Sequence, residues 1–133
     1  MMKMAKNGYT LTEILMVVII LAILASMTLP RLASQTEKAN VSEGAGILGA
    51  IRQGEMAYRL DTGSYLSPAS DADWAKLGLD NPNTGTPKFT YSVDGAGTGT
   101  ATRAADAGSY AGKTVTLTIT GTWGGDHPNV PSN

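Results

Sequence analysis

The sequence predicts an α+β protein in which a long N-terminal helix packs on a small antiparallel β-sheet. Residues 14–29 form an uncharged apolar run, and a helical pattern of apolar and polar residues continues to residue 60. Alternating apolar and polar residues, the pattern of half-buried strands, then occur beyond residue 88. We therefore divide the chain into a basic leader (1–8), a long helix (9–60) and a small αβ head (61–133).

Composition limits what the head can be. The 133-residue chain has a net charge of −1 and no basic stripe, so nothing in the sequence indicates nucleic-acid binding. It has no cysteine, which excludes disulfides and thiol chemistry. With one Phe and two Trp in the whole chain, the head can bury only a thin core. We therefore expect it to depend on the helix for support.

The apolar run is long enough to be a membrane anchor. At 1.5 Å per residue, a helix of about 20 residues spans the hydrocarbon thickness of a bilayer. Residues 9–30 cover this length if Glu13 is tolerated. Lys3 and Lys6 precede the run and predict a cytoplasmic N-terminus. The sequence thus predicts a single-pass protein with its head on the other side of the membrane.

The position of small residues bears on processing. A secretory signal peptide is cut after its apolar run, where Ala22, Ala25 and Ser26 make a cleavage site conceivable. Gly8, however, lies before the run. A cut after Gly8 removes the basic leader and keeps the anchor.

The stretch Lys-Asn-Gly-Tyr-Thr-Leu-Thr-Glu, residues 6–13, followed by the apolar run, resembles the leader motif of type IV pilins and type II secretion pseudopilins. The resemblance implies that a prepilin peptidase cuts after Gly8 and methylates the amine of Tyr9. Phenylalanine is commoner at that place, and Tyr9 keeps the aromatic ring. Glu13 and Pro30 match the family's assembly glutamate and helix proline. The resemblance covers roughly residues 5–30 and is looser over the head.

Two of these residues have alternative interpretations. A carboxylate at the centre of a membrane helix costs about 2.5–3.5 kcal/mol, and less near the helix start. The resemblance implies that Glu13 offsets this cost by pairing with the Tyr9 amine of a neighbouring copy. The alternative is a simple anchor with a tolerated acidic residue. Pro30 lacks an N–H, and it marks either a hinge or only the end of the membrane segment.

The remaining helix and its connections can be placed from the pattern. Leu48, Ile51 and Tyr58 share one helical face, bordered by Ile47, and we expect that face to carry the head. Residues 61–64 contain the turn residues that end the helix. Residues 71–79 predict a short second helix, and its inward residues are Trp74 and Leu77.

Three strands are predicted after the loop at residues 81–87. They cover residues 88–93, 100–104 and 113–120, and the last has Val115, Leu117 and Ile119 facing inward. Residues 124–133 contain Gly and Pro and predict a loosely ordered tail.

No catalytic, metal or cofactor site stands out. His127 is the only histidine, and its Gly/Pro surroundings predict a solvated loop residue. Asp71, Asp73 and Asp80 do not form the oxygen series that calcium requires. We therefore expect no enzyme activity and no cofactor.

The sequence thus favours a structural subunit of a helical filament, assembled from the bacterial inner membrane. The resemblance implies further copies, a prepilin peptidase, a platform protein and an assembly ATPase as partners. A type IV pilus is preferred over a type II pseudopilus, because the last strand is rich in Thr and no calcium loop is evident. A membrane-anchored binding module is the alternative of another class.

Overall fold

The computed structural model describes residues 7–133, so residues 1–6 of the predicted leader lie outside the described residues. Helix α1 spans Leu11–Thr62 and is followed by the short helix α2, Asp71–Lys76. Four strands follow, β1 (Phe89–Val93), β2 (Gly99–Arg103), β3 (Thr114–Leu117) and β4 (Trp123–Gly124), with a 3-10 turn at Gly108–Tyr110. The chain divides into two compact units, Met1–Thr36 and Glu37–Asn133.

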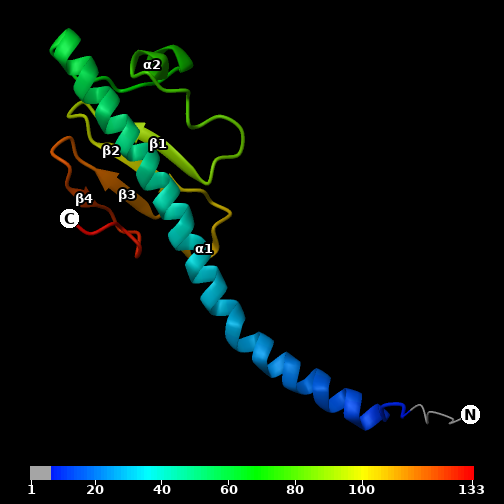
Figure 1. The fold of residues 1–133 in the computed structure, drawn as a ribbon. Coiled ribbons are helices and arrows are strands. Elements are labelled where there is room, and N and C mark those ends of the chain that lie inside the picture. Colours follow the sequence, from blue (N-terminus) through cyan, green and yellow to red (C-terminus); the bar gives the residue numbers. More distant parts are fainter. Residues whose placement is uncertain (1–6) are drawn as a thin grey trace, which may run out of the picture. The chain divides into compact units, whose positions relative to one another are not determined.

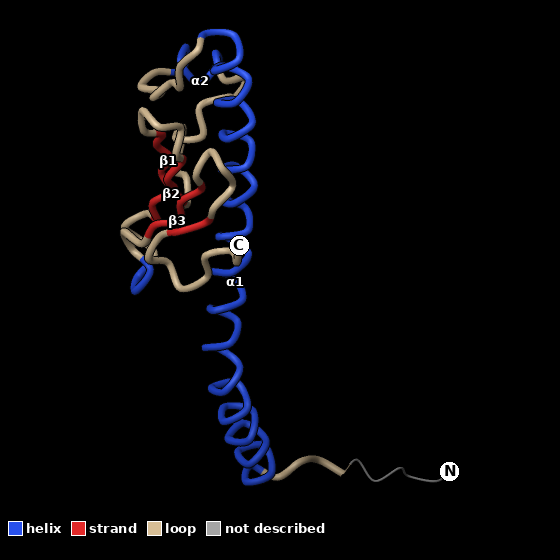
Figure 2. The backbone as a smooth tube through the Cα atoms, turned by 90° about the vertical axis from the view of Figure 1, so that its left-hand side faces the viewer, coloured by secondary structure: helices blue, strands red, loops and turns tan. Residues whose placement is uncertain are grey.

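In the second unit, the C-terminal part of α1 packs against a four-stranded antiparallel sheet of order β1-β2-β3-β4 (Figures 1 and 2). The strands pair in sequence order, so each connection is a simple hairpin. This arrangement confirms the predicted fold class. Strand β1 alternates buried and exposed residues along its whole length, as its sequence predicts.

The core of this unit joins the helix, the sheet and α2. The predicted helical stripe is confirmed, because Leu48 and Ile51 are fully buried while Ile47 and Tyr58 border the core. The rest of the core comes from α1, α2, the residue directly after α2 and three strands. Its members are Val41, Trp74, Leu77, Phe89, Tyr91, Val93, Ala101, Val115 and Leu117. A core this small explains why the sheet needs the helix to bury its inner face.

Helix α2 is defined by its first residues and ended by a glycine. The Ser70 hydroxyl accepts a hydrogen bond from the Asp73 N–H, which caps the N-terminus. Gly78 adopts a positive φ of 75° two residues after Lys76, a conformation that ends helices. The helix is thus shorter than the predicted range 71–79. Trp74 and Leu77 are buried, as predicted.

The third strand is shorter than its predicted range, 113–120. Strand β3 ends at Leu117, and Ile119 lies in a turn rather than on the inner face. The Thr118 N–H donates to the Thr122 carbonyl, and Gly121 has a φ of 94°, so the chain reverses here into β4. The Ile119 carbonyl accepts a bond from Arg52 Nε at 2.8 Å, which holds this turn against α1.

The glycines of α1 have different surroundings. A Cβ on Gly54 would lie 2.5 Å from the Leu77 carbonyl oxygen, so Gly54 allows the segment after α2 to approach the helix backbone. Gly46 and Gly49 have nothing within 4 Å of such a Cβ.

This contrast gives a stability prediction. Gly54→Ala forces a backbone shift and should lower the free energy of unfolding by about 1–3 kcal/mol. Gly49→Ala should raise it by up to about 1 kcal/mol, because alanine is the better helix former. Urea unfolding in detergent micelles, followed by Trp fluorescence, measures both. Equal effects of the two substitutions would contradict the close approach at Gly54.

Glu55 is a buried acidic residue on the inner face of α1. It is 0% exposed, and its Oε2 accepts a bond from the Leu66 N–H at 2.9 Å. Its Oε1 has no hydrogen-bond partner among the described residues. Burial raises the pKa of Glu55 above its ordinary 4.5, and the bond from Leu66 only partly opposes this.

The raised pKa predicts a pH effect on stability. Folding favours the protonated carboxyl, so the contribution is fully present below pH 4.5 and is lost as pH rises through the folded-state pKa. Glu55→Gln, which cannot ionise, should remove this decline. Unfolding free energies of both proteins between pH 4 and 8 test the prediction. Parallel pH profiles would show that Glu55 does not cause the decline.

Candidate functional site

The predicted processing site lies in exposed, non-helical chain just before α1. Gly8 and Tyr9 have no regular secondary structure, and Tyr9 is 80% exposed. Nothing lies within 4 Å of a Cβ built on Gly8. A peptidase needs an accessible backbone, and this segment provides one. Cleavage after Gly8 and methylation of Tyr9 stay predictions.

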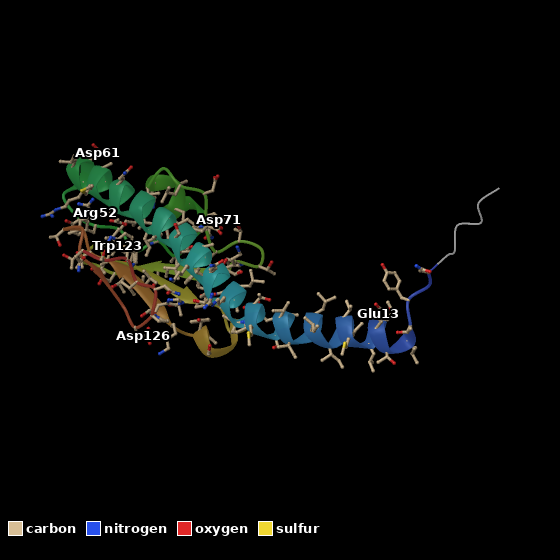
Figure 3. All side chains as sticks on the ribbon, turned by 60° about the horizontal axis from the view of Figure 1, so that its bottom comes forward. Glu13, Arg52, Asp61, Asp71, Trp123 and Asp126 are labelled. Carbon is tan, nitrogen blue, oxygen red and sulfur yellow. The ribbon has the colours of Figure 1, made fainter. Side chains whose placement is uncertain are left out.

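Glu13 caps the start of its own helix. The Glu13 N–H donates to the Thr10 hydroxyl at 3.2 Å, and the Thr10 N–H donates to Glu13 Oε2 at 3.4 Å. These reciprocal bonds form a capping box. Thr10 was not among the predicted site residues, although the spacing Thr-x-x-Glu is a recognisable signal for this cap. Glu13 is exposed at the helix N-terminus, where the helix dipole favours a negative charge (Figure 3).

The helix beyond Glu13 presents apolar side chains on all sides. Its most hydrophobic 18-residue window has a mean hydropathy of 2.4, and none of that window is buried within the protein. By length and composition, α1 could cross a membrane. A surface this apolar needs a cover, which a bilayer or neighbouring apolar helices can supply.

Pro30 lies inside α1, which continues on both sides of it. Because proline has no N–H, the Ser26 carbonyl four residues earlier lacks its helical donor. The nearby hydroxyls of Ser26 and Thr28 donate to the carbonyls of Ile23 and Ala25. The helix is therefore locally weakened at Pro30 without ending there. The hinge role of Pro30 stays a prediction.

The comparisons with known proteins agree with this geometry. Residues 3–29 match the family described as the prokaryotic N-terminal methylation motif. The chain thus carries a prokaryotic N-terminal methylation motif. This confirms the resemblance inferred from residues 6–13 and the apolar run.

Similar proteins carry a more specific name. A type II secretion system core protein G from Pseudomonas aeruginosa is 37% identical over 67 residues, which are 50% of this chain and 47% of that protein. The proteins of the same name from Vibrio cholerae and Dickeya chrysanthemi are 39% identical over 72 residues and 31% identical over 94 residues. The first alignment covers 53% of this chain and 48% of the Vibrio protein. The second covers 71% of this chain and 60% of the Dickeya protein. The chain spans about half the length of most of these relatives.

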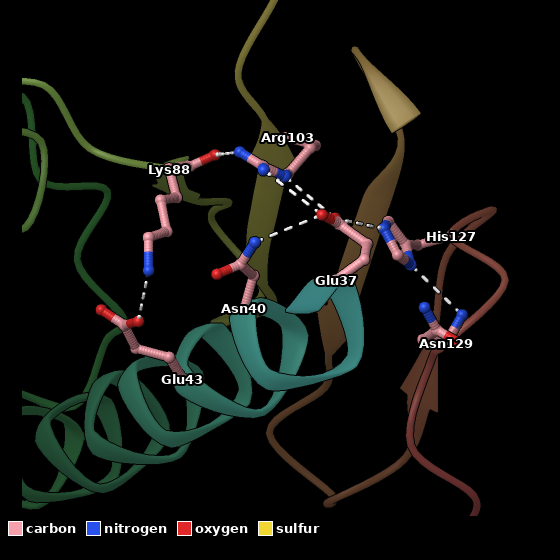
Figure 4. A network of polar contacts seen from close by, with 7 residues as sticks. All are labelled: Glu37, Asn40, Glu43, Lys88, Arg103, His127 and Asn129. Atoms are coloured by element: carbon pink, nitrogen blue, oxygen red, sulfur yellow. Dashed lines mark hydrogen bonds and ion pairs between the residues drawn. The ribbon is translucent and has the colours of Figure 1, made fainter. Parts of the chain in front are cut away.

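A buried polar network between α1 and the head was not foreseen from the sequence (Figure 4). Glu37, 5% exposed, pairs with Arg103 through contacts of 2.9 Å from Nε and 3.3 Å from Nη2. Its Oε2 also accepts a bond from Asn40, and its Oε1 contacts His127 Nε2 at 3.0 Å. Burial alone would raise the pKa of Glu37, but bonds from Arg103, Asn40 and His127 outweigh it and lower the pKa below 4.5.

The prediction that His127 is a solvated residue of a loosely ordered tail is wrong. The side chain is buried, and its ring stacks on Tyr110 with centroids 5.3 Å apart. Nδ1 accepts a bond from the Asn129 N–H, so the proton of the neutral ring lies on Nε2 and is donated to Glu37. The hydrogen bond between His127 and Glu37 thus holds the tail at 125–130 against α1. It also gives the buried Glu37 carboxylate one of the partners that it needs.

The acidic residues considered for calcium have other roles. Asp73 accepts bonds from Lys76, Ser70 and the Ala69 N–H, which lower its pKa to about 2. Asp71 accepts a bond from the Asn81 side chain. Among residues 7–133, no group of three or more Asp, Glu or His side chains is placed to hold a metal ion.

Proposed function

We propose that this chain is a structural, non-enzymatic pseudopilin subunit of a type II secretion filament. The observation that carries the proposal is the N-terminal motif, in which an exposed Gly8–Tyr9 segment leads directly into an unburied apolar helix capped by Glu13. The names of the relatives favour secretion over the surface pilus preferred from the sequence. One argument for the pilus also weakens, because the Thr-rich strand ends at Leu117.

In this proposal the precursor waits in the bacterial inner membrane with its N-terminus in the cytoplasm. A prepilin peptidase removes residues 1–8 and methylates Tyr9. The new amine is then available to Glu13 of another copy, and the apolar helices leave the bilayer for the core of a helical filament. A platform protein and an assembly ATPase drive this step.

Processing is tested by producing the chain with and without a prepilin peptidase. We expect a mature protein that begins at N-methyl-Tyr9, measured by intact mass and N-terminal fragmentation. Gly8→Asp, which places a charged side chain before the cut, should keep the full leader. A mature protein with any other first residue would contradict the proposed cut.

The filament class is tested in a host with both kinds of machinery. Deletion of this gene should abolish release of secreted proteins into the medium and leave surface pili intact. Loss of surface pili with normal secretion would favour the pilus instead. A chain that stays monomeric in membranes with either machinery present would favour the anchored binding module.

A further inference from the structure

Both edges of the head sheet are occupied by an asparagine side chain. Strands β1 and β4 form the edges of the four-stranded sheet. Backbone N–H and C=O groups on an edge strand are free to pair with another strand, which makes edges prone to unwanted association. The two asparagines bond to these groups directly.

At the first edge, Asn83 binds the outward backbone groups of Tyr91. The Ala104 N–H donates to the Lys88 carbonyl, and the Asp94 N–H donates to the Thr98 carbonyl. Since outward and inward groups alternate, the backbone groups of Tyr91 point away from β2. Asn83 Oδ1 accepts from the Tyr91 N–H at 2.6 Å, and its Nδ2 donates to the Tyr91 carbonyl at 2.8 Å. A residue of an added antiparallel strand would make the same pair of bonds.

The second edge repeats the arrangement. The Thr118 N–H donates to the Thr122 carbonyl, so the backbone groups of Trp123 point away from β3. Asn133 Oδ1 accepts from the Trp123 N–H at 2.5 Å, and its Nδ2 lies 3.4 Å from the Trp123 carbonyl. One outward residue of each edge strand, Tyr91 in β1 and Trp123 in β4, is thus bound twice by one carboxamide.

Strand β1 has particular need of this protection. Its sequence Phe-Thr-Tyr-Ser-Val is uncharged, contains no Pro and pairs continuously with β2 without a bulge. It therefore lacks the charges, prolines and bulges that commonly protect edges. It is also self-complementary, because antiparallel pairing centred on Tyr91 sets Thr90 of one copy opposite Ser92 of the other.

We propose that Asn83 and Asn133 close the two edges of the sheet, and that without Asn83 the β1 edge pairs with β1 of a second copy. The carboxamides confine contacts between copies to other surfaces of the chain. This inference concerns the head alone and does not depend on the proposed role in secretion.

The experiment uses the full chain in detergent micelles, at less than one chain per micelle. The chain has no cysteine, so Ser92→Cys provides a single site for a nitroxide label on the outer face of β1. Neighbouring strands lie about 5 Å apart, so β1–β1 pairing produces strong dipolar broadening. We expect broadening with Asn83→Ala, and none with Asn83 present or with Thr86→Ala, a matched change at an exposed position of the same loop.

Asn83→Asp separates edge opening from general loosening of the loop. The carboxylate cannot donate a hydrogen bond to the Tyr91 carbonyl, so one of the two hydrogen bonds to Tyr91 is lost. Its charge at the edge still disfavours strand addition, so no broadening is expected. Broadening with Thr86→Ala, or a folded Asn83→Ala protein without broadening, would overturn the proposal.

A second measurement covers the case in which Asn83→Ala does not fold. In the unsubstituted chain, the Tyr91 N–H should exchange with solvent as slowly as the backbone amides of the central strand β2, which are hydrogen-bonded to its neighbouring strands. Exchange as fast as that of exposed loop amides would show that Asn83 does not hold the edge.

Discussion

Glu37→Ala should lower the free energy of unfolding of the head by about 3–5 kcal/mol, since removing one partner of a buried ion pair leaves the other charge uncompensated. The Arg103 and Glu37 side chains are 10% and 6% exposed, so both are largely shielded from bulk water. Asn40 and His127 lose their acceptor as well. Urea unfolding of the full chain in micelles, followed by near-UV circular dichroism, measures the loss.

Glu43→Ala is the matched control for this prediction. Glu43 lies on the same helix and pairs with Lys88 at 3.3 Å, but the two side chains are 62% and 55% exposed. Exposed pairs contribute about 0–1 kcal/mol, so the control should change little. Losses of similar size for Glu37→Ala and Glu43→Ala would show that burial of the network does not matter.

The lowered pKa of Glu37 adds a pH signature opposite in sign to that of Glu55. Folding favours the ionised Glu37 carboxylate, so its contribution is present above pH 4.5 and is lost as pH falls through the folded-state pKa. The acid limb of the stability profile should therefore flatten in Glu37→Gln, while Glu55→Gln alters the limb above pH 4.5.

The two buried glutamates also show where sequence reasoning stops. The helical period that places Leu48 and Ile51 on the inner face also places Glu37 and Glu55 there, at spacings of three and two turns from Leu48. The pattern was therefore visible. What it could not supply were the partners, because Arg103 and His127 lie 66 and 90 residues away from Glu37.

Strands were predictable where one face is buried and the other exposed, as in β1. The prediction of β3 was too long because alternation continues through Thr118 and Ile119 while the backbone already turns. That turn depends on the positive φ of Gly121 and on the distant Arg52, neither of which appears in a two-residue period. Tail order was missed for the same reason, since distant partners hold the tail, among them Glu37 for His127 and Trp123 for Asn133.

The N-terminal motif was accessible from the sequence because its signals are local. Gly8, Tyr9 and Glu13 lie within one short stretch, and the apolar run follows directly. The structure adds the bond between Glu13 and Thr10, which gives the carboxylate a role within its own chain before any assembly. Glu13 can therefore matter for assembly in two ways, as the charge that pairs with a neighbouring amine or as the cap of its helix.

Glu13→Gln should reduce filament assembly by roughly tenfold or more, because it removes the charge that pairs with the neighbouring amine in the proposed mechanism. Glutamine can still accept the bond from the Thr10 N–H, because Gln serves in capping boxes as Glu does. It cannot form the proposed charge-assisted bond to the Tyr9 amine of a neighbouring copy. Bonds of this kind contribute about 1.5–3 kcal/mol, and about 1.4 kcal/mol corresponds to a factor of ten. Sheared filament yield, divided by the amount of mature subunit in the membrane, measures the effect.

Thr10→Ala is the complementary variant, because it removes the hydroxyl that accepts from the Glu13 N–H and keeps the charge. Losing a cap costs about 1 kcal/mol of local helix stability, which the bilayer can offset, so assembly should fall only slightly. Both variants must first be shown to lose residues 1–8 normally. Normal filaments from Glu13→Gln, with assembly lost in Thr10→Ala, would assign Glu13 to the helix cap and remove the amine pairing from the mechanism.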